Sequence, residues 1–284
     1  MKWAVHETPE RLMNDQYMPS SSPYQLFMQT INDDVSTHWH EFYEISFVVS
    51  GSATHVLNGV PARIAKGSIF LMTPADFHEI IMDADGETLQ LYDLIFTEQL
   101  IREPLMELLF DRISVKSHIF DTDEFTQIEA EFKRIWRETH DWQAGSEFIV
   151  QGCLERVLID LSRACRPKQI QTPASGEQLV QSPIRKALIY IQHHFRDSIP
   201  LEEVARLCGL SANYFSECFH KQTGMTFQLY VQELRLQFAK SLLKATKLPI
   251  TEVSFASGFN TLPHFERTFK KRFAATPRQF RQSI

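Results

Sequence analysis

The feature that most constrains the fold is an internal repeat in the last third of the chain. One copy spans 201–226 and the other spans 250–276. Matching positions, after one extra residue in the turn of the second copy, include Gly209 and Gly258, Phe215 and Phe265, Phe219 and Phe269, and Lys221 and Lys271. A repeated apolar pattern predicts a repeated supersecondary unit.

Each copy has the pattern of a helix-turn-helix. In the first copy, Gly209 ends one helix because glycine adopts the left-handed conformation at little cost, and Ser211 is suited to cap the next helix. In the second copy, Gly258 has the same role and Pro263 falls in the first turn of a helix, where its missing N–H does no harm. The segment between the copies, 227–245, carries one apolar stripe and predicts a long connecting helix.

The second helix of each copy is predicted to bury two phenylalanines and to expose a polar, partly basic face. Such a helix suits the major groove of double-stranded DNA. We expect base contacts from Asn213, Ser216 and Glu217 in the first copy and from His264, Glu266 and Arg267 in the second. We expect phosphate contacts from Lys221, Lys270 and Lys271.

The distribution of charge supports this assignment. The chain has a formal net charge of −6, but residues 1–166 carry 13 Lys and Arg against 27 Asp and Glu, whereas residues 167–284 carry 16 against 8. A basic module attached to an acidic one is typical of DNA binding confined to one domain. We therefore predict an acidic domain over 1–166, a polar linker over 167–182, and a DNA-binding domain over 183–284.

The segment 183–281 resembles the DNA-binding domain of the AraC/XylS family of transcription regulators. The signature positions lie in GFNTLPHFERTFKKRFAATPRQFR, residues 258–281. Ala274 departs from the family pattern, which usually has glycine there, and Pro263 stands where a small polar residue is common. The resemblance implies a sequence-specific DNA-binding regulator with two helix-turn-helix units.

The region 24–96 contains many short β-rich segments, and the Asn58-Gly59 pair is a strong hairpin signal. HWHEFYEISFVVSG, residues 38–51, resembles the cupin-like sensor domain of AraC-type regulators, most of all the sugar-responsive members. The fold class is therefore predicted as multi-domain α+β: a cupin-like β-barrel or jelly roll with helices after it, then an all-α domain. Residues 1–23 are predicted to form a mobile arm that either closes over a ligand or is disordered, and the sequence does not decide between these possibilities.

Two helices are expected within 98–166. The apolar stripe of the second helix, over 147–165, either packs on the barrel or contacts a second subunit, and the sequence leaves both possibilities open. The family resemblance implies a homodimer, and it implies effector binding and dimerisation for the domain over 1–166.

Candidate effector-binding residues are His38, His40, Glu44 and His78. The even spacing of the first three would place them on one face of a continuous strand, and His78 is expected to join them inside the barrel. Three interpretations remain open: a polar patch that binds an effector, a divalent transition-metal site, or structural histidines. The HxHxxxE spacing matches the first motif of metal-binding cupins, whereas the second motif fits poorly. Neighbouring aromatic residues suit a sugar ring but also suit any β core, and the resemblance to sugar-responsive members implies a carbohydrate effector.

Other functional classes are not indicated. No nucleophile-elbow, P-loop or dinucleotide motif is present, so we predict neither an enzyme nor an organic cofactor. Four cysteines without a CxxC pair, no signal peptide and no long apolar run predict a cytoplasmic protein that makes no membrane contact. Two alternatives remain: a metal-dependent cupin protein, or a DNA-binding protein whose N-terminal domain only dimerises.

Overall fold

The computed structural model describes residues 10–20, 22–84, 88–102, 105, 117–165 and 183–283. The chain divides into two compact units, Met1–Pro173 and Ala174–Ile284, each of which has its own core. The division falls inside the predicted linker, 167–182, which lies outside the described residues.

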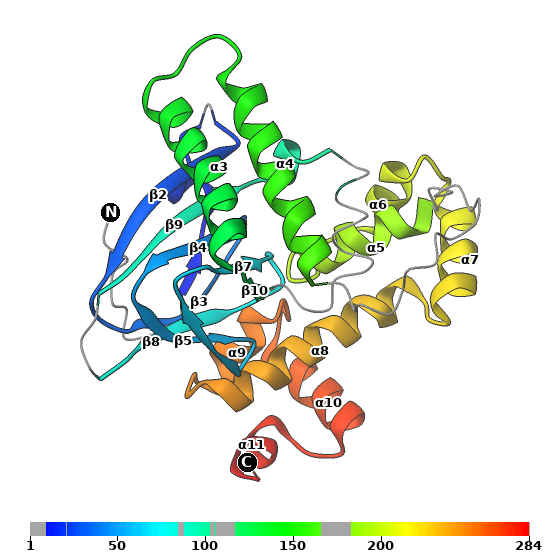
Figure 1. Cartoon of the computed structure of the whole chain (residues 1–284). Helices are drawn as coiled ribbons and strands as arrows, with labels where there is room; N and C mark the ends of the chain where they lie inside the picture. Colours follow the sequence, from blue (N-terminus) through cyan, green and yellow to red (C-terminus); the bar gives the residue numbers. More distant parts are fainter. Residues whose placement is uncertain are drawn as a thin grey trace. The chain divides into compact units, whose positions relative to one another are not determined.

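The first unit is a β-sandwich, as the sequence predicts (Figure 1). Over its described residues, one sheet has the order β1-β3-β8-β5-β6 and the other has the order β10-β7-β4-β9-β2. The strands are β1 (Glu10–Leu12), β2 (Tyr24–Ile31), β3 (Val35–His40), β4 (Tyr43–Ser50), β5 (Ser52–Leu57), β6 (Val60–Ala65), β7 (Ser68–Met72), β8 (His78–Met82), β9 (Leu89–Phe96) and β10 (Ser117–Ile119). A short 3-10 helix, η1 (Glu98–Leu100), follows β9.

The predicted Asn58-Gly59 hairpin is confirmed. Strands β5 and β6 pair antiparallel up to Leu57 and Val60, which leaves two residues for the turn. Asn58 has φ 52° and Gly59 has φ 80°. These are the two positive φ values of a type I′ turn, whose twist matches that of the flanking strands.

Strand β4 shows how the layers of the first unit are built. Glu44, Ser46 and Val48 face the interior between the two sheets. Phe47, on the opposite face, stacks on Phe132 of helix α3 (Thr122–His140), with ring centroids 5.4 Å apart. The second sheet is therefore covered by the first sheet on one face and by α3 on the other.

Helix α4 (Ser146–Ala164) packs against α3 (Figure 1). The side chains of its predicted stripe are at most 1% exposed within this single chain: Val150, Leu154, Val157, Leu158 and Leu161. Of the two possibilities left open by the sequence, packing inside the unit is the observed one. This stripe is consequently not available as a contact with a second subunit.

Residues 10–20 of the predicted arm over 1–23 pack against the sandwich. Strand β1 pairs parallel with β3, and the short helix α1 (Asn14–Tyr17) follows it. Leu12 and Met18 are buried in a cluster with Phe42 and Ile95. This apolar burial holds the segment against the sandwich, and the sequence pattern did not reveal these two anchoring side chains among polar ones. Residues 1–9 lie outside the described part of the chain.

The second unit is helical over its described residues. Its helices are α5 (Pro183–His194), α6 (Leu201–Leu207), α7 (Ala212–Thr223), α8 (Phe227–Ala245), α9 (Ile250–Ala256), α10 (Leu262–Phe273) and α11 (Pro277–Gln282). Helices α6 and α7 form one helix-turn-helix and α9 and α10 form the other, with α8 between them at the predicted bounds. No helix in the described residues combines the length and the hydropathy that crossing a bilayer requires.

The turns within the two helix-turn-helix units have matching backbones. Gly209 has φ 68° and Gly258 has φ 84°, so both lie in the left-handed region. The amide that follows each glycine donates to the carbonyl five residues earlier, at 2.9 Å in the first unit and 3.1 Å in the second. Such bonds satisfy carbonyl groups at a helix end.

Candidate DNA-binding face and effector pocket

Helices α7 and α10 have the same sequence of buried, half-buried and exposed residues over all 12 positions. Phe215 and Phe219 of α7 are fully buried, as are Phe265 and Phe269 of α10. All nine side chains predicted to contact DNA are exposed: Asn213, Ser216, Glu217, Lys221, His264, Glu266, Arg267, Lys270 and Lys271. The two helices therefore present equivalent polar faces from equivalent apolar anchors.

Superposition of the two burial patterns identifies one surface residue that the sequence analysis missed. Position by position, Tyr214 of α7 corresponds to His264 of α10, whereas Asn213 corresponds to Pro263. Tyr214 is 56% exposed. An aromatic ring with a hydroxyl group can contact a thymine methyl or a phosphate, and the phenylalanine register of the repeat is the signal that would have revealed this residue.

Capping differs between the two recognition helices. The hydroxyl of Ser211 accepts a hydrogen bond from the amide of Tyr214, which confirms the predicted N-cap of α7. Thr261 occupies the N-cap position of α10 but makes no side-chain capping bond. At the other ends, Gly224 has φ 72° and Ala274 has φ 58°. Ala274 therefore adopts the left-handed conformation at the position where the AraC/XylS pattern usually has glycine.

One basic side chain beside this face forms an ion pair with the connecting helix α8. Arg272 of α10 donates from Nε to the Glu233 carboxylate of α8 at 2.8 Å. The guanidinium group holds the pKa of Glu233 below its usual range. Arg272 thus ties the second recognition helix to the connecting helix, whereas Lys270 and Lys271 extend from α10 into solvent.

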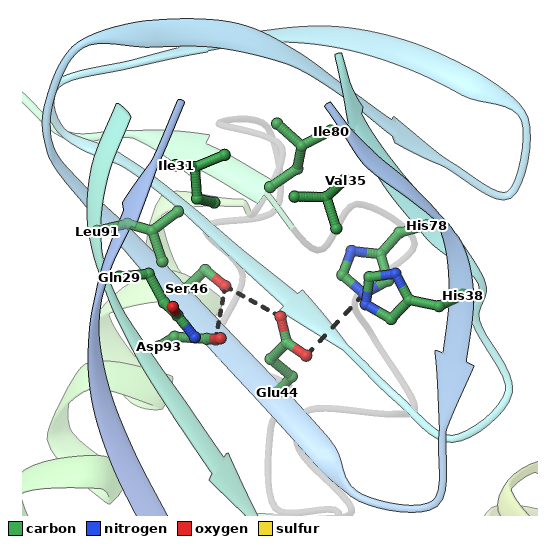
Figure 2. Close-up of a pocket in the computed structure, with 10 residues that line it drawn as sticks. All are labelled: Gln29, Ile31, Val35, His38, Glu44, Ser46, His78, Ile80, Leu91 and Asp93. Atoms are coloured by element: carbon green, nitrogen blue, oxygen red, sulfur yellow. Dashed lines mark hydrogen bonds and ion pairs between the residues drawn. The ribbon is translucent and has the colours of Figure 1, made fainter. Parts of the chain in front are cut away.

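In the first unit, a small pocket with a cavity volume of about 20 Å³ lies between the two sheets (Figure 2). Its lining residues are Gln29, Ile31, Val35, His38, Glu44, Ser46, His78, Ile80, Leu91 and Asp93. The polar groups lie at one end and the apolar ones at the other (Figure 2). A pocket of this kind offers orienting hydrogen bonds together with an apolar wall.

The predicted placement of His38, His40 and Glu44 on one continuous strand is wrong. The histidines belong to β3 of one sheet, and Glu44 belongs to β4 of the facing sheet. The chain turns at Glu41 and Phe42, and Glu44 returns toward the histidines across the sandwich. The structure still brings the predicted residues together, because the two strands face each other rather than forming one strand.

Strand pairing and burial fix the histidine cluster. His38 and His78 are direct partners in the β3–β8 ladder, and their ring centroids are 4.2 Å apart. The Glu44 Oε2 atom lies 3.4 Å from His40 Nε2 and 4.0 Å from His78 Nε2. All four side chains are buried. His40 does not line the pocket itself but contacts Glu44 from beside it.

Backbone carbonyl groups determine which nitrogen atom of two of these rings carries a proton. His38 Nδ1 donates to the Ser36 carbonyl oxygen at 2.8 Å, and His40 Nδ1 donates to the Phe42 carbonyl oxygen at 2.6 Å. Because a carbonyl oxygen only accepts, each neutral ring keeps its lone pair on Nε2. His78 Nδ1 lies 3.2 Å from His55 Nε2.

Burial keeps the deeper imidazoles uncharged. It lowers the pKa of His78 well below its usual value, with smaller contributions from the neighbouring histidines. Burial likewise lowers the pKa of His55 to about 4. At neutral pH both rings are therefore neutral and able to accept through a nitrogen lone pair.

A carboxyl pair on the second sheet was not predicted. Ser46 and Asp93 are partners in the β4–β9 ladder, and the Ser46 hydroxyl lies 3.0 Å from Asp93 Oδ1 and 3.3 Å from Glu44 Oε1. Burial raises the pKa of Asp93 to about 6 and that of Glu44 well above its usual value. The signal in the sequence was a single acidic residue inside the apolar strand LQLYDLIF, residues 89–96.

These two sites define a DNA-binding regulator with a separate ligand-binding unit. Comparison with known proteins agrees with this class. Residues 204–283 match the family model described as a helix-turn-helix domain, and residues 26–112 match the AraC-like ligand binding domain. The chain therefore combines an AraC-like ligand-binding domain with a helix-turn-helix domain of the AraC type, which makes it a DNA-binding regulator with a ligand-binding domain.

Relatives match over most of the chain. It is 26% identical over 265 residues to the HTH-type transcriptional activator RhaS of Escherichia coli strain SE11, covering 88% of each protein. Among solved structures, the C-terminal domain of AraT, a response regulator from Geobacillus stearothermophilus, has 31% identity and a TM-score of 0.36 over 38% of this chain and 89% of that one. ToxT of Vibrio cholerae O395 has 11% identity and a TM-score of 0.39 over 92% of this chain and 97% of that one.

Proposed function

We propose that this regulator reads an operator with the exposed faces of α7 and α10, and that a carbohydrate held between the sheets of the first unit controls it. The matching burial of α7 and α10 carries the DNA proposal. Two helices that expose equivalent polar faces from equivalent phenylalanine anchors are suited to two successive major grooves.

The proposed roles of the DNA-facing residues differ between base and phosphate contacts. Asn213, Ser216 and Glu217 of α7 and His264, Glu266 and Arg267 of α10 face base edges. Lys221, Lys270 and Lys271 contact phosphates. Loss of a base contact costs about 1–3 kcal/mol at one base pair, whereas loss of a phosphate contact weakens binding to all sequences alike.

The test measures the affinity of Arg267→Ala and Lys271→Ala for DNA selected from a random pool, at several salt concentrations. Arg267→Ala should relax the preference at one base pair, and Lys271→Ala should reduce the salt slope by about one unit without changing the preferred sequence. Lys133→Ala in α3 of the first unit is the matched control and should change neither. A sequence-selective loss from Lys271→Ala would contradict the assignment.

The effector proposal rests on the chemistry of the pocket. Gln29, Ser46 and the Glu44–Asp93 pair offer both donors and acceptors to hydroxyl groups, because the raised pKa values leave a proton on the carboxyl pair. The apolar end of the pocket suits the C–H face of a sugar ring. The proposed effector contacts are therefore His38, Glu44 and His78 together with these newly identified polar groups, and His40, the fourth residue that the sequence indicated, acts through Glu44.

A panel of neutral monosaccharides tests this proposal through the unfolding transition of the first unit. An effector at one hundred times its dissociation constant should stabilise the unit by about 2.7 kcal/mol. Ser46→Ala should weaken the response. Ser50→Ala, on the same strand but with its hydroxyl bonded to the exposed Gln90, should leave the response unchanged. No response to any sugar in the panel would favour a first unit that only dimerises.

Assembly and regulatory direction complete the proposal. The regulator acts as a homodimer in the cytoplasm, where DNA is accessible and where its free cysteines remain reduced. It activates transcription, as the name of RhaS states for that relative. Sedimentation equilibrium should give twice the 33.0 kDa mass of one chain.

A further inference from the structure

Two polar atoms inside the sandwich lie close to one another without forming a hydrogen bond. Glu44 Oε2 and His78 Nε2 are buried and have no hydrogen-bond partner among the described residues. They lie 4.0 Å apart. A buried polar atom without a partner is costly, and two such atoms that lie close together are suited to share a bound cation.

His38 adds a third donor atom to the same point. The ligand atoms of His38, Glu44 and His78 all lie within 4.8 Å of one another. The bond from His38 Nδ1 to the Ser36 carbonyl places the lone pair of the ring on Nε2 and fixes the ring orientation. Histidines that bind a metal through one ring nitrogen usually donate a hydrogen bond from the other nitrogen to a group such as a backbone carbonyl.

We propose that His38, His78 and Glu44 bind one divalent transition-metal ion between the two sheets. Two imidazole nitrogens and one carboxylate oxygen favour a borderline ion such as Zn²⁺ over Mg²⁺ or Ca²⁺, which prefer oxygen ligands. Ligand atoms around a tetrahedral zinc lie roughly 3.3–3.6 Å apart, given metal–ligand distances of about 2.0–2.2 Å. The Glu44 and His78 ligand atoms, 4.0 Å apart, therefore need to close by less than about 1 Å.

His40 is a positioning residue in this site. Its Nδ1 donates to the Phe42 carbonyl at 2.6 Å, and its Nε2 lies 3.4 Å from Glu44 Oε2. The ring also stacks on Phe42, with centroids 4.6 Å apart and planes 2° from parallel. It therefore limits the carboxylate of Glu44 to the side of the pocket where His38 and His78 lie.

The ion would join the two sheets. His38 and His78 come from β3 and β8 of one sheet, and Glu44 comes from β4 of the other. Three protein ligands leave at least one coordination position for water or an effector oxygen on the pocket side. This last role rests on the proposed function, whereas the binding of the metal does not.

The direct test uses the full-length chain, stripped with a chelator and titrated with Zn²⁺ alone. One equivalent should bind in calorimetry and should remain after gel filtration, as measured by elemental analysis. Co²⁺ in the same site should give a visible absorption band. His78→Ala should abolish both signals. His140→Ala, which removes an exposed histidine of α3, is the control and should retain them.

Glu44→Gln is the second variant, because it preserves the shape of the side chain if His78→Ala fails to fold. It should reduce the Zn²⁺ affinity by more than about 10-fold, because loss of an outer-shell partner alone typically costs about 10–100-fold. Wild-type protein that binds no Zn²⁺ at micromolar concentrations, or unchanged binding by Glu44→Gln, would overturn the metal site. Metal binding without any response to carbohydrate would refute only the proposed effector.

Discussion

Ala274 gives the sharpest test of the backbone analysis. At φ 58° it ends α10 in the left-handed conformation, where Gly224 ends α7 at φ 72°. The left-handed conformation destabilises a folded L-residue by about 1–2 kcal/mol. Replacement by glycine removes this strain, but the greater freedom of glycine in the unfolded chain lowers the free energy of unfolding by roughly 0.5–1 kcal/mol. Ala274→Gly should therefore stabilise the second unit by about 0.5–1 kcal/mol.

Two glycines provide the comparison. A Cβ added at Gly224 would meet no heavy atom within 4 Å, so Gly224→Ala should cost only the backbone difference, about 0.5–1 kcal/mol. A Cβ at Gly258 would lie 2.6 Å from the Arg196 carbonyl oxygen and 2.7 Å from its Cα. Gly258→Ala adds an overpacking cost of about 1–3 kcal/mol to the same backbone difference, because both of these atoms belong to the main chain.

The tryptophans allow this series to be measured in the intact chain. All four, Trp3, Trp39, Trp136 and Trp142, lie in the first unit. In a urea titration, tryptophan fluorescence follows the sandwich, and circular dichroism at 222 nm also follows the helical second unit. The transition seen by circular dichroism but not by fluorescence belongs to the second unit.

The expected order of midpoints for that second transition is Ala274→Gly, wild type, Gly224→Ala and Gly258→Ala, from highest to lowest. The fluorescence transition should not move. If Ala274→Gly lowered the midpoint, Ala274 would not be a strained C-cap. If Gly258→Ala cost no more than Gly224→Ala, the close approach of Arg196 would be relieved without penalty, and the reasoning from the Cβ contact would fail.

Three further outcomes use the same two signals. Phe132→Ala should destabilise the first unit by about 3–5 kcal/mol and move the fluorescence transition, because the buried ring leaves a cavity against β4 and β9. Phe265→Ala should cost a similar amount, about 3–5 kcal/mol, but only in the second transition. Arg272 lowers the folded-state pKa of Glu233, so the charged carboxylate stabilises the second unit above about pH 4.5 and loses this effect as pH falls through the lower folded value. Glu233→Gln should therefore flatten the acid side of the stability–pH curve measured by circular dichroism, and an unchanged slope would mean that the pair contributes nothing.

The second unit was the more predictable one because its sequence repeats. Phenylalanines spaced four apart fix which face of α7 and α10 is buried, and Gly209, Gly258 and Ser211 mark the turns. Even α8 begins and ends where its apolar stripe does. The correspondence of Tyr214 with His264 was missed. The second copy has one extra residue in its turn, so positions after the turn are shifted by one relative to positions before it.

The pocket was less predictable because it depends on contacts between sheets. Periodicity within HWHEFYE suggested one strand, but the chain turns after His40, and Glu44 approaches from the opposite sheet. Ser46 and Asp93 become neighbours only through the β4–β9 register, which joins positions 47 residues apart. Spacing along a strand predicts a shared face, but it does not predict which faces meet across a sandwich.

The layering of the first unit provides a physical route from the pocket to the helices that cover it. Glu44 and Ser46 face the pocket, and the intervening side chains of the same strand face α3. Phe47 stacks on Phe132, and Tyr92 of β9 stacks on the same ring at 5.5 Å. A ligand or ion that draws β4 toward the facing sheet must therefore change how α3 packs, because cores are too dense to absorb the shift. Effector control requires such a difference between two states.

Addition of the identified ligand should change amide hydrogen exchange in α3, and Phe132→Leu should reduce that change without abolishing ligand binding. Identical exchange in α3 with and without bound ligand would show that the signal leaves the sandwich by another face.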